Sequence, residues 1–214
     1  NMKLQGISKF LLKTLVNWTY PMAQQIVCVS KGVEADFREY YSYKKNNLST
    51  TYNPVLDDAY YEKLKVPVTH KFFNDTNKVI LAVGRLTEAK NFGFLIRSFK
   101  ALHDQHPDTR LIILGEGELR TEFEALIAEL SLTEVVDLPG FDSNPYAYFK
   151  YVSLFVLSSN WEGLPGVLIQ ALASKVKVVS TNCPSGPMEI LDDAKFGLLV
   201  ECNDQAGLTQ AMHQ

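Results

Sequence analysis

The feature that most constrains the fold of this chain is an alternation between two kinds of segment from residue 78 onward. Short runs of apolar, often β-branched residues alternate with longer stretches whose apolar residues recur at helical spacing. The runs expected to form strands are 79–83, 111–114, 135–138, 154–157, 176–179 and 197–200. Continuous apolar strands separated by helices are typical of a parallel sheet covered on both faces. The pattern predicts an α/β fold with a doubly wound, Rossmann-like parallel sheet.

The stretches between these runs are predicted to be helices that cover the sheet. They are expected at 90–104, 117–130, 146–150, 166–174, 186–191 and 204–213. In open parallel sheets, ligands bind at the carboxyl ends of the strands, where loops lead into helices. The residues that follow each strand are therefore the first candidates for a functional site.

Residues 1–55 have a different pattern. An expected helix is followed by an apolar strand at 25–29 and by a second helix at 31–41. One strand with two helices cannot build a two-sided core of its own. We therefore predict that residues 1–55 are the end of a preceding domain with its linker, and that residues 56–214 form a second domain.

The first of these helices has an apolar face, which comprises Phe10, Leu11, Leu12, Leu15 and Val16. Such a face is expected to pack on its own domain, and docking to an anionic membrane surface is the alternative. No apolar run in the chain approaches the length that spans a bilayer.

Charge and cysteine content narrow the class of partner and the compartment. The formal net charge is −3, which gives no reason to expect nucleic acid as a partner. The three cysteines form no CxxC pair, a pattern that favours a reducing cytoplasm over a disulfide framework or a zinc site.

Glu162 stands in the loop that follows the expected strand at 154–157. The stretch from Gly163 through Leu164 and Pro165 to Gly166 leads directly into a helix. Free N–H groups at a helix start attract anionic oxygen, and glycines allow close approach of a ligand. A carboxylate there suits a ligand that carries both phosphate and hydroxyl groups. A simple acidic residue at a helix N-terminus is the alternative.

Two cations follow the first strand of the repeating pattern. Arg85 comes directly after Gly84 at the strand end, and Lys90 is expected in the first turn of the next helix. A guanidinium fork and an ammonium together match a diphosphate. A surface ion pair between Lys90 and Glu88 is the alternative. The chain has no Asp-x-Asp motif, and no metal site is predicted.

These motifs in combination resemble the donor-binding domain of the retaining glycosyltransferases of family 4, the group 1 transferases with a GT-B fold. The resemblance covers residues 20–214. The motifs that carry it are Gly84-Arg85-Leu86 with Lys90, Gly115-Glu116-Gly117, Leu154 to Ser159, Glu162-Gly163-Leu164-Pro165 and Ser180 to Pro187. Asn144-Pro145-Tyr146 and the Cys-Pro-Ser-Gly-Pro loop are most similar to bacterial enzymes that build lipopolysaccharide, capsule or lipid-linked glycans.

The resemblance implies a role for each matching residue. Arg85 and Lys90 would hold the diphosphate, and Glu162 with the Gly163–Gly166 backbone would position the donor sugar. Phe141 would meet the base. The family carries a second Glu for the ribose where this chain has Gln170, so weaker nucleotide binding is expected. A second departure is Lys175, which stands where the family usually has glycine after the helix, so it is expected either to adopt a left-handed conformation or to end the helix differently.

The implied function is transfer of a hexosyl or N-acetylhexosaminyl group, with retention, from a nucleotide-sugar to a glycan or lipid-linked acceptor. The donor is expected to be a UDP-sugar, with no further cofactor. The protein would be cytoplasmic, and peripheral contact with the inner face of the membrane stays open. This polypeptide alone is expected to bind the nucleotide but to catalyse sugar transfer poorly. Two alternatives stay open: a degenerate nucleotide-sugar binding module, and a sugar-nucleotide epimerase or phosphorylase of the same architecture.

Overall fold

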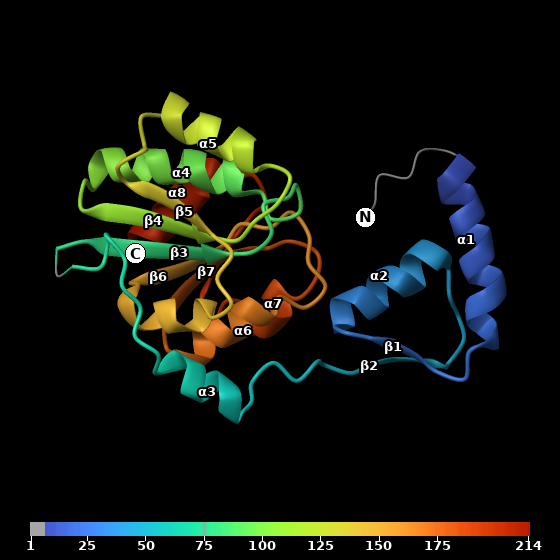
Figure 1. Ribbon diagram of the computed structural model, residues 1–214. Helices are drawn as coiled ribbons and strands as arrows, with labels where there is room; N and C mark the ends of the chain where they lie inside the picture. Colours follow the sequence, from blue (N-terminus) through green and yellow to red (C-terminus); the bar gives the residue numbers. More distant parts are fainter. Residues whose placement is uncertain (1–6, 75) are drawn as a thin grey trace.

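The computed structural model describes residues 7–74 and 76–214. Residues 1–6 of the predicted first domain lie outside the described residues. Figure 1 shows two parts joined by an extended stretch that runs from β2 to α3. We call residues 7–55 the N-terminal segment and residues 56–214 the sheet unit.

The sheet unit is built on one parallel sheet with the strand order β5-β4-β3-β6-β7-β8. The strands are β3 (Lys78–Val83), β4 (Thr109–Leu114), β5 (Val136–Gly140), β6 (Leu154–Leu157), β7 (Lys177–Thr181) and β8 (Leu198–Val200). The order extends outward in one direction from β3 and then in the other from β6, so the predicted doubly wound sheet is confirmed. The reversal lies between β3 and β6, where open sheets of this class bind ligands.

Helices cover both faces of this sheet (Figure 1). One face packs against α4 (Phe92–Gln105), α5 (Arg120–Glu129) and α8 (Gln205–His213). The other packs against α6 (Gly166–Ala173), the short α7 (Pro187–Ile190) and a 3₁₀ helix, Pro145–Tyr151. Helix α3 (Asp58–Leu64) lies below that 3₁₀ helix.

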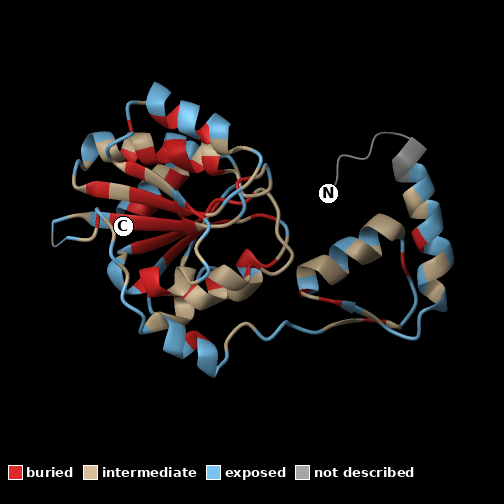
Figure 2. Cartoon of the chain, in the orientation of Figure 1, coloured by how far each residue is buried: buried red, intermediate tan, exposed pale blue. Residues whose placement is uncertain are grey.

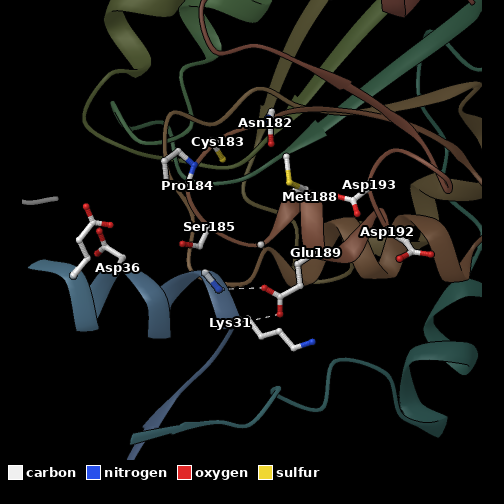
Figure 3. Close-up of a pocket in the computed structure, with 13 residues that line it drawn as sticks. Lys31, Asp36, Asn182, Cys183, Pro184, Ser185, Met188, Glu189, Asp192 and Asp193 are labelled. Atoms are coloured by element: carbon white, nitrogen blue, oxygen red, sulfur yellow. Dashed lines mark hydrogen bonds between the residues drawn. The ribbon is translucent and has the colours of Figure 1, made fainter. Parts of the chain in front are cut away.

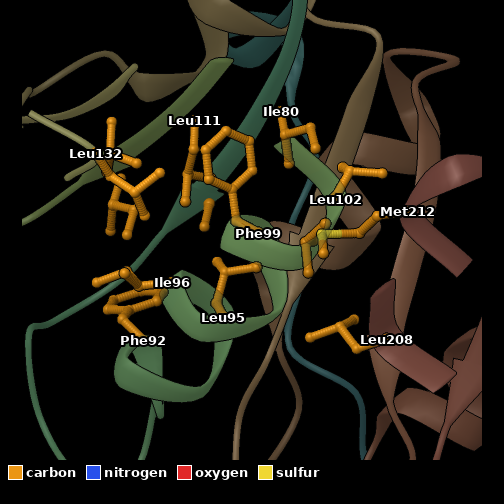
Figure 4. Close-up of a cluster of buried hydrophobic side chains, with 14 of the residues drawn as sticks. Ile80, Phe92, Leu95, Ile96, Phe99, Leu102, Leu111, Leu132, Leu208 and Met212 are labelled. Atoms are coloured by element: carbon orange, nitrogen blue, oxygen red, sulfur yellow. The ribbon is translucent and has the colours of Figure 1, made fainter. Parts of the chain in front are cut away.

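The apolar runs are explained by burial on both sides of the sheet. In β3, Ile80 contributes to the core under α4, whereas its neighbour Leu81 contributes to the core under α6. Because successive strand residues point to opposite faces, a strand covered on both sides is apolar throughout. Figure 4 shows the first core, in which Phe99 of α4 lies among strand and α8 side chains and is fully buried. Figure 2 shows buried residues concentrated in this sheet.

The N-terminal segment contains a strand that the sequence pattern did not predict. Its elements are α1 (Ile7–Thr19), a 3₁₀ helix (Tyr20–Met22), β1 (Ile26–Cys28), α2 (Lys31–Tyr41) and β2 (Leu48–Thr50). β2 pairs in parallel with β1. A small cluster of Cys28, Tyr43 and Leu48 is buried between them and α2. β2 escaped prediction because its Leu-Ser-Thr sequence is short and has no apolar run.

Most of the predicted apolar face of α1 is uncovered by the described residues, so its packing on the domain of which residues 1–55 were predicted to be the end stays a prediction. Val16 is buried, but Phe10, Leu11 and Leu15 are each more than half exposed. A sheet of two strands offers too little surface to cover both helices of the segment. The membrane alternative is not tested by this arrangement.

Several helices end with a non-glycine residue in the left-handed region, and α6 and α2 are two of them. Lys175 follows α6 with φ 61°, as expected for a residue in place of glycine. Ser42 follows α2 with φ 52°. In both, the next residue's N–H reaches back five residues to a helix carbonyl, from Val176 to Ala171 and from Tyr43 to Arg38.

Candidate functional site

The candidate site lies at the carboxyl ends of β3 and β6. These two strands are neighbours at the reversal of strand order. Gly84 follows β3, and Ser158 follows β6. The loops after these strands therefore start side by side, although they are far apart in the sequence.

Lys90 and Glu162 meet in this region as an ion pair. The Lys90 Nζ atom lies 2.6 Å from Glu162 Oε1, and the two side chains are 20% and 12% exposed. The hydroxyl of Ser159, which is fully buried, donates a hydrogen bond of 2.6 Å to the same carboxylate oxygen. One oxygen of Glu162 thus receives two donors, and water has little access to the pair. Charges sheltered in this way interact more strongly than exposed ones.

This geometry bears on the alternative interpretations of both residues. Helix α6 begins at Gly166 after Pro165, and its first turn contains no acidic residue. Glu162 is therefore not an acidic residue of the helix start. The Lys90 ammonium bonds across the sheet edge to Glu162.

Two polar residues after β6, Ser158 and Asn160, which sequence reasoning left without individual roles, join the two loops. The Ser158 hydroxyl donates to the Lys90 carbonyl at 2.8 Å. The Asn160 backbone N–H donates to the Ala89 carbonyl at 2.8 Å, and its side-chain amide donates to the Glu88 carbonyl, also at 2.8 Å. Together with Ser159, these residues fix the backbone on both sides of the ion pair. The sequence signal that could have identified these residues is a run of polar residues with short side chains directly after an apolar strand.

Gly84 connects the ion pair to Arg85. A β-carbon at Gly84 would lie 2.9 Å from the Lys90 side-chain Cε, so the lysine stem crosses directly over this glycine. The Arg85 side chain itself is exposed, and no described residue forms a hydrogen bond or ion pair with its guanidinium. Of the three residues to which the resemblance gave catalytic roles, Lys90 and Glu162 are in contact, and Arg85 directly follows the glycine that the Lys90 stem crosses.

Arg85 lines a cavity of about 360 Å³. The cavity also contains Gly84, Glu116 and Phe141 in its wall. Lys90 and Glu162 do not line it. The Phe141 ring is largely exposed, so it presents an open aromatic surface beside the strand ends.

The loop from Gly163 to Gly166 packs against the N-terminal segment. A β-carbon on Gly163 would lie 3.4 Å from Val29, and one on Gly166 would lie 3.4 Å from Val55. Neither glycine has a positive φ. Pro165 is buried, and Leu164 is partly covered. The backbone conformation of this loop therefore does not itself require glycine, and the predicted contact with a ligand stays a prediction.

Gln170 lies on the second turn of α6. Its side-chain amide donates to the Tyr146 hydroxyl at 3.3 Å. Its backbone carbonyl accepts a hydrogen bond from the buried Tyr60 hydroxyl. Burial raises the pKa of Tyr60 above its ordinary value, which keeps this phenol protonated as a donor.

A larger cavity, of about 650 Å³, lies between α2 and the segment that follows β7 (Figure 3). Five carboxylates and one ammonium line it: Asp36, Glu39, Glu189, Asp192, Asp193 and Lys31. Sequence reasoning did not identify this cavity, because its walls come from two parts of the chain. Cys183 also lines it, and burial raises the pKa of the Cys183 thiol to about 12. That thiol is therefore neutral at physiological pH.

Metal-binding clusters and membrane-spanning helices are both absent from the described residues. Within residues 7–74 and 76–214, no group of three or more His, Cys, Asp or Glu side chains is placed to hold a metal ion. Among the helices of the same residues, none combines the length and apolarity needed to cross a bilayer.

Comparison with known proteins identifies the family. Residues 69–214 match the family described as "Glycosyl transferases group 1". A Campylobacter jejuni relative, N-acetylgalactosamine-N,N'-diacetylbacillosaminyl-diphospho-undecaprenol 4-alpha-N-acetylgalactosaminyltransferase, is 38% identical over 96% of this chain and 53% of its own length. An uncharacterised glycosyltransferase of Methanocaldococcus jannaschii is 34% identical over 87% of this chain and 47% of its own length. The chain thus spans about half the length of these curated relatives.

Solved structures show the same fold. Anabaena HepE, in complex with UDP, aligns with a TM-score of 0.80 and 18% identity over 97% of this chain and 58% of its own. A variant of S. aureus TarM, in complex with UDP and two further ligands, aligns with a TM-score of 0.77 and 20% identity over 94% of this chain and 39% of its own. The fold is therefore that of GT-B glycosyltransferases, and the chain belongs to the group 1 glycosyl transferases.

Proposed function

We propose that this chain forms the donor-binding part of a retaining glycosyltransferase that uses a UDP-sugar, without a metal or other cofactor. The transferred group is a hexosyl or N-acetylhexosaminyl residue, and the acceptor is a glycan or lipid-linked sugar in bacterial surface polysaccharide assembly. The name of the C. jejuni relative describes transfer of N-acetylgalactosamine to a diphospho-undecaprenol-linked sugar. The HepE and TarM structures both contain UDP. These likenesses support the class of donor and of acceptor.

The observation that carries the proposal is the Lys90–Glu162 pair at the reversal of strand order. A diphosphate is a stronger partner for an ammonium than a single carboxylate, because it carries more negative charge on more oxygens. When the diphosphate of the donor binds the Lys90 ammonium, Glu162 keeps its hydrogen bond from the Ser159 hydroxyl and has free lone pairs. Those lone pairs then accept hydrogen bonds from sugar hydroxyls. The pair thereby exchanges one internal bond for contacts with both halves of the donor.

The remaining contacts follow from the cavity beside this pair. Arg85 supplies a second cation to the diphosphate from the wall of the 360 Å³ cavity. The uracil base lies against the backbone at Phe141 in the same wall. Gln170 hydrogen-bonds to the ribose, and the backbone from Gly163 to Gly166 lies along the sugar.

The reaction breaks the bond between the anomeric carbon and the β-phosphate oxygen. Lys90 and Arg85 stabilise the negative charge that develops on the leaving UDP. The acceptor hydroxyl oxygen attacks the same face, and its proton passes to the departing phosphate oxygen, so configuration is retained. Glu162 holds the sugar hydroxyls while positive charge develops at the anomeric carbon.

We assign residues 1–55 to the acceptor-binding side of the enzyme and residues 56–214 to the donor side. The enzyme works in the cytoplasm, at the inner face of the membrane where a lipid-linked acceptor is presented. The chain by itself binds the donor and turns it over poorly, because the assigned acceptor part offers an acceptor only a two-stranded sheet with α1 and α2 in the described residues.

The test is calorimetric titration of the chain with UDP and with GDP. UDP is expected to bind, and Arg85→Ala to weaken it about tenfold or more, the loss expected for one charged hydrogen bond. The matched control is Arg97→Ala on α4, whose side chain is also exposed, and it should bind like the parent. The proposal is wrong if neither nucleotide binds and Arg85→Ala cannot be distinguished from the parent.

Gln170 favours one alternative, a degenerate module that binds a nucleotide-sugar without transferring it. The same titration separates the two functions when combined with an assay of sugar transfer in the intact enzyme. Gln170→Glu should tighten UDP binding about tenfold, because a charged acceptor replaces a neutral one. A transferase that works with glutamine should change little in turnover. A large gain in transfer on this substitution would instead identify a decayed catalytic site.

A further inference from the structure

The N-terminal segment touches the candidate site through the start of helix α2. Ser30 precedes this helix and is fully buried. Its hydroxyl oxygen accepts a hydrogen bond from the Val33 N–H at 3.2 Å, which caps the helix. The same hydroxyl donates to the carbonyl of Gly163 at 2.7 Å. Ser30 therefore bonds, across the boundary between the two parts, to the residue next to Glu162.

Glu189 of α7 holds the same helix start from the sheet unit. Its two carboxylate oxygens accept hydrogen bonds from the backbone N–H groups of Lys31, at 3.1 Å, and Gly32, at 3.3 Å (Figure 3). A carboxylate at this position also interacts favourably with the positive end of the helix dipole. A hydrogen bond to Glu189 raises the pKa of Tyr52, which follows β2. The contact thus involves three separate stretches of the chain.

The approach of the two parts is close. A β-carbon on Gly32 would lie 2.7 Å from the Ser185 side chain. Ser185 in turn donates its backbone N–H to the Glu162 carbonyl at 3.1 Å. The Glu162 N–H donates to the Pro184 carbonyl at 2.7 Å. The segment from Glu162 to Gly163 is therefore held on one side by the loop after β7 and on the other by Ser30.

We propose that Ser30 is a positioning residue for Glu162, and that its hydroxyl, supported by Glu189 at the start of α2, sets the place of the Glu162–Gly163 backbone. This inference rests on the proposed function, because it assigns to Ser30 a share in recognition of the donor sugar. Loss of the hydroxyl frees the Gly163 carbonyl and lets the Glu162 carboxylate move relative to Lys90. The sugar part of the donor then loses its binding partner, whereas the UDP part keeps its own.

The first experiment needs no nucleotide. Trp161 precedes Glu162, and Trp18 is the other tryptophan of the chain. Because Trp18 is largely exposed, Trp18→Phe leaves a folded protein in which fluorescence reports on Trp161 alone. In that background Ser30→Gly should increase quenching of Trp161 by acrylamide. Glycine is a nearly equivalent helix cap, so helix α2 is retained while the donated hydrogen bond is lost. Far-UV circular dichroism checks that helix content is unchanged.

Two further variants complete this experiment. Ser30→Thr keeps a hydroxyl and should restore the quenching of the parent. Ser49→Ala removes a serine of the same segment whose hydroxyl bonds to Gln25 within that segment, and it should have no effect. Unchanged quenching in Ser30→Gly, or no restoration in Ser30→Thr, would overturn the positioning role.

The second experiment compares the affinities for UDP-N-acetylgalactosamine and for UDP. Ser30→Gly should reduce the preference for the sugar nucleotide about threefold to tenfold, the range for one neutral hydrogen bond, and leave the affinity for UDP unchanged. Equal loss for both ligands would show a merely structural role. If the parent binds neither ligand, the proposed function fails, while the quenching experiment still decides whether Ser30 positions the loop.

Discussion

The sheet unit and the N-terminal segment are made of the same kinds of element but differ in how much they can bury. In the sheet unit, strands in the order β5-β4-β3-β6-β7-β8 present two broad faces, and two extensive cores form under the helices. In the described N-terminal segment, the sheet has two strands, β1 and β2, and the buried cluster comprises Cys28, Tyr43 and Leu48. Figure 2 shows this contrast directly. Within the described residues, the helices that lie on the wider sheet are therefore the more deeply buried ones.

The largest expected effect is the difference in stability loss when a phenylalanine is replaced by alanine in each region. Phe99 of α4 is 0% exposed, whereas Phe10 of α1 is 72% exposed. Phe99→Ala should lower the free energy of unfolding by about 3–5 kcal/mol, because it opens a cavity in a close-packed core. Phe10→Ala should change it by no more than about 0.5 kcal/mol. Urea unfolding followed by circular dichroism measures both, and similar costs for the two variants would contradict the contrast.

An intermediate effect is expected at the ends of α6 and α2. Lys175→Gly and Ser42→Gly each remove a side chain from a left-handed residue, and each should stabilise the protein by about 1 kcal/mol. Lys65→Gly is the control, because Lys65 ends α3 with φ −79° and gains nothing from glycine. If the two regions unfold together, both glycine variants should raise the urea midpoint of the same unfolding transition. A shift confined to a separate, earlier transition in Ser42→Gly would show that the N-terminal segment unfolds on its own.

The smallest expected effect is a difference between the two regions in how their contributions to folding stability depend on pH. Burial lowers the pKa of His103 in α4 below its ordinary value of 6.5, with a smaller contribution from Arg110. Below that value the unfolded chain binds a proton that the folded protein resists, so stability falls as the pH falls. In the N-terminal segment, hydrogen bonds from Thr50 and Arg38 lower the pKa of Glu34 below its ordinary value of 4.5. Its contribution is lost only in more acidic solution.

Urea midpoints at about pH 7.5 and about pH 5.5 isolate the histidine contribution, because this interval lies above the range in which Glu34 titrates. The parent protein should lose more stability over the interval than His103→Gln. An identical loss in both proteins would assign the effect to other groups.

Much of the fold followed from patterns along the chain. The strand at 154–157 and the helix at 31–41 were predicted with the bounds that the structure has. Lys175 was expected to adopt a left-handed conformation or to end its helix differently, and it is left-handed. These predictions succeed because each depends on residues that are close together in the sequence.

Other features depended on distant residues. β2 has no strand signal of its own and exists because Leu48–Thr50 find a parallel partner in β1. In the candidate site, the direct ion pair between Lys90 and Glu162 was not predicted from the sequence, in which Glu88 is the acidic residue nearer to Lys90 along the chain. The contacts of Ser30 with Gly163 and of Glu189 with Lys31 carried no local signal, because each side chain acts on a backbone far away in sequence.

The sequence by itself determined the class of fold and the edge of the sheet where chemistry is expected. Periodicity reports which faces of each element avoid water, and loop residues after apolar strands report where polar groups gather. Only the tertiary structure decided that Lys90 bonds to Glu162, that Arg85 stands in a neighbouring cavity, and that α1 stays uncovered. Strand order and the width of each sheet bring distant residues together or leave them apart, and no pattern within a single segment encodes that geometry.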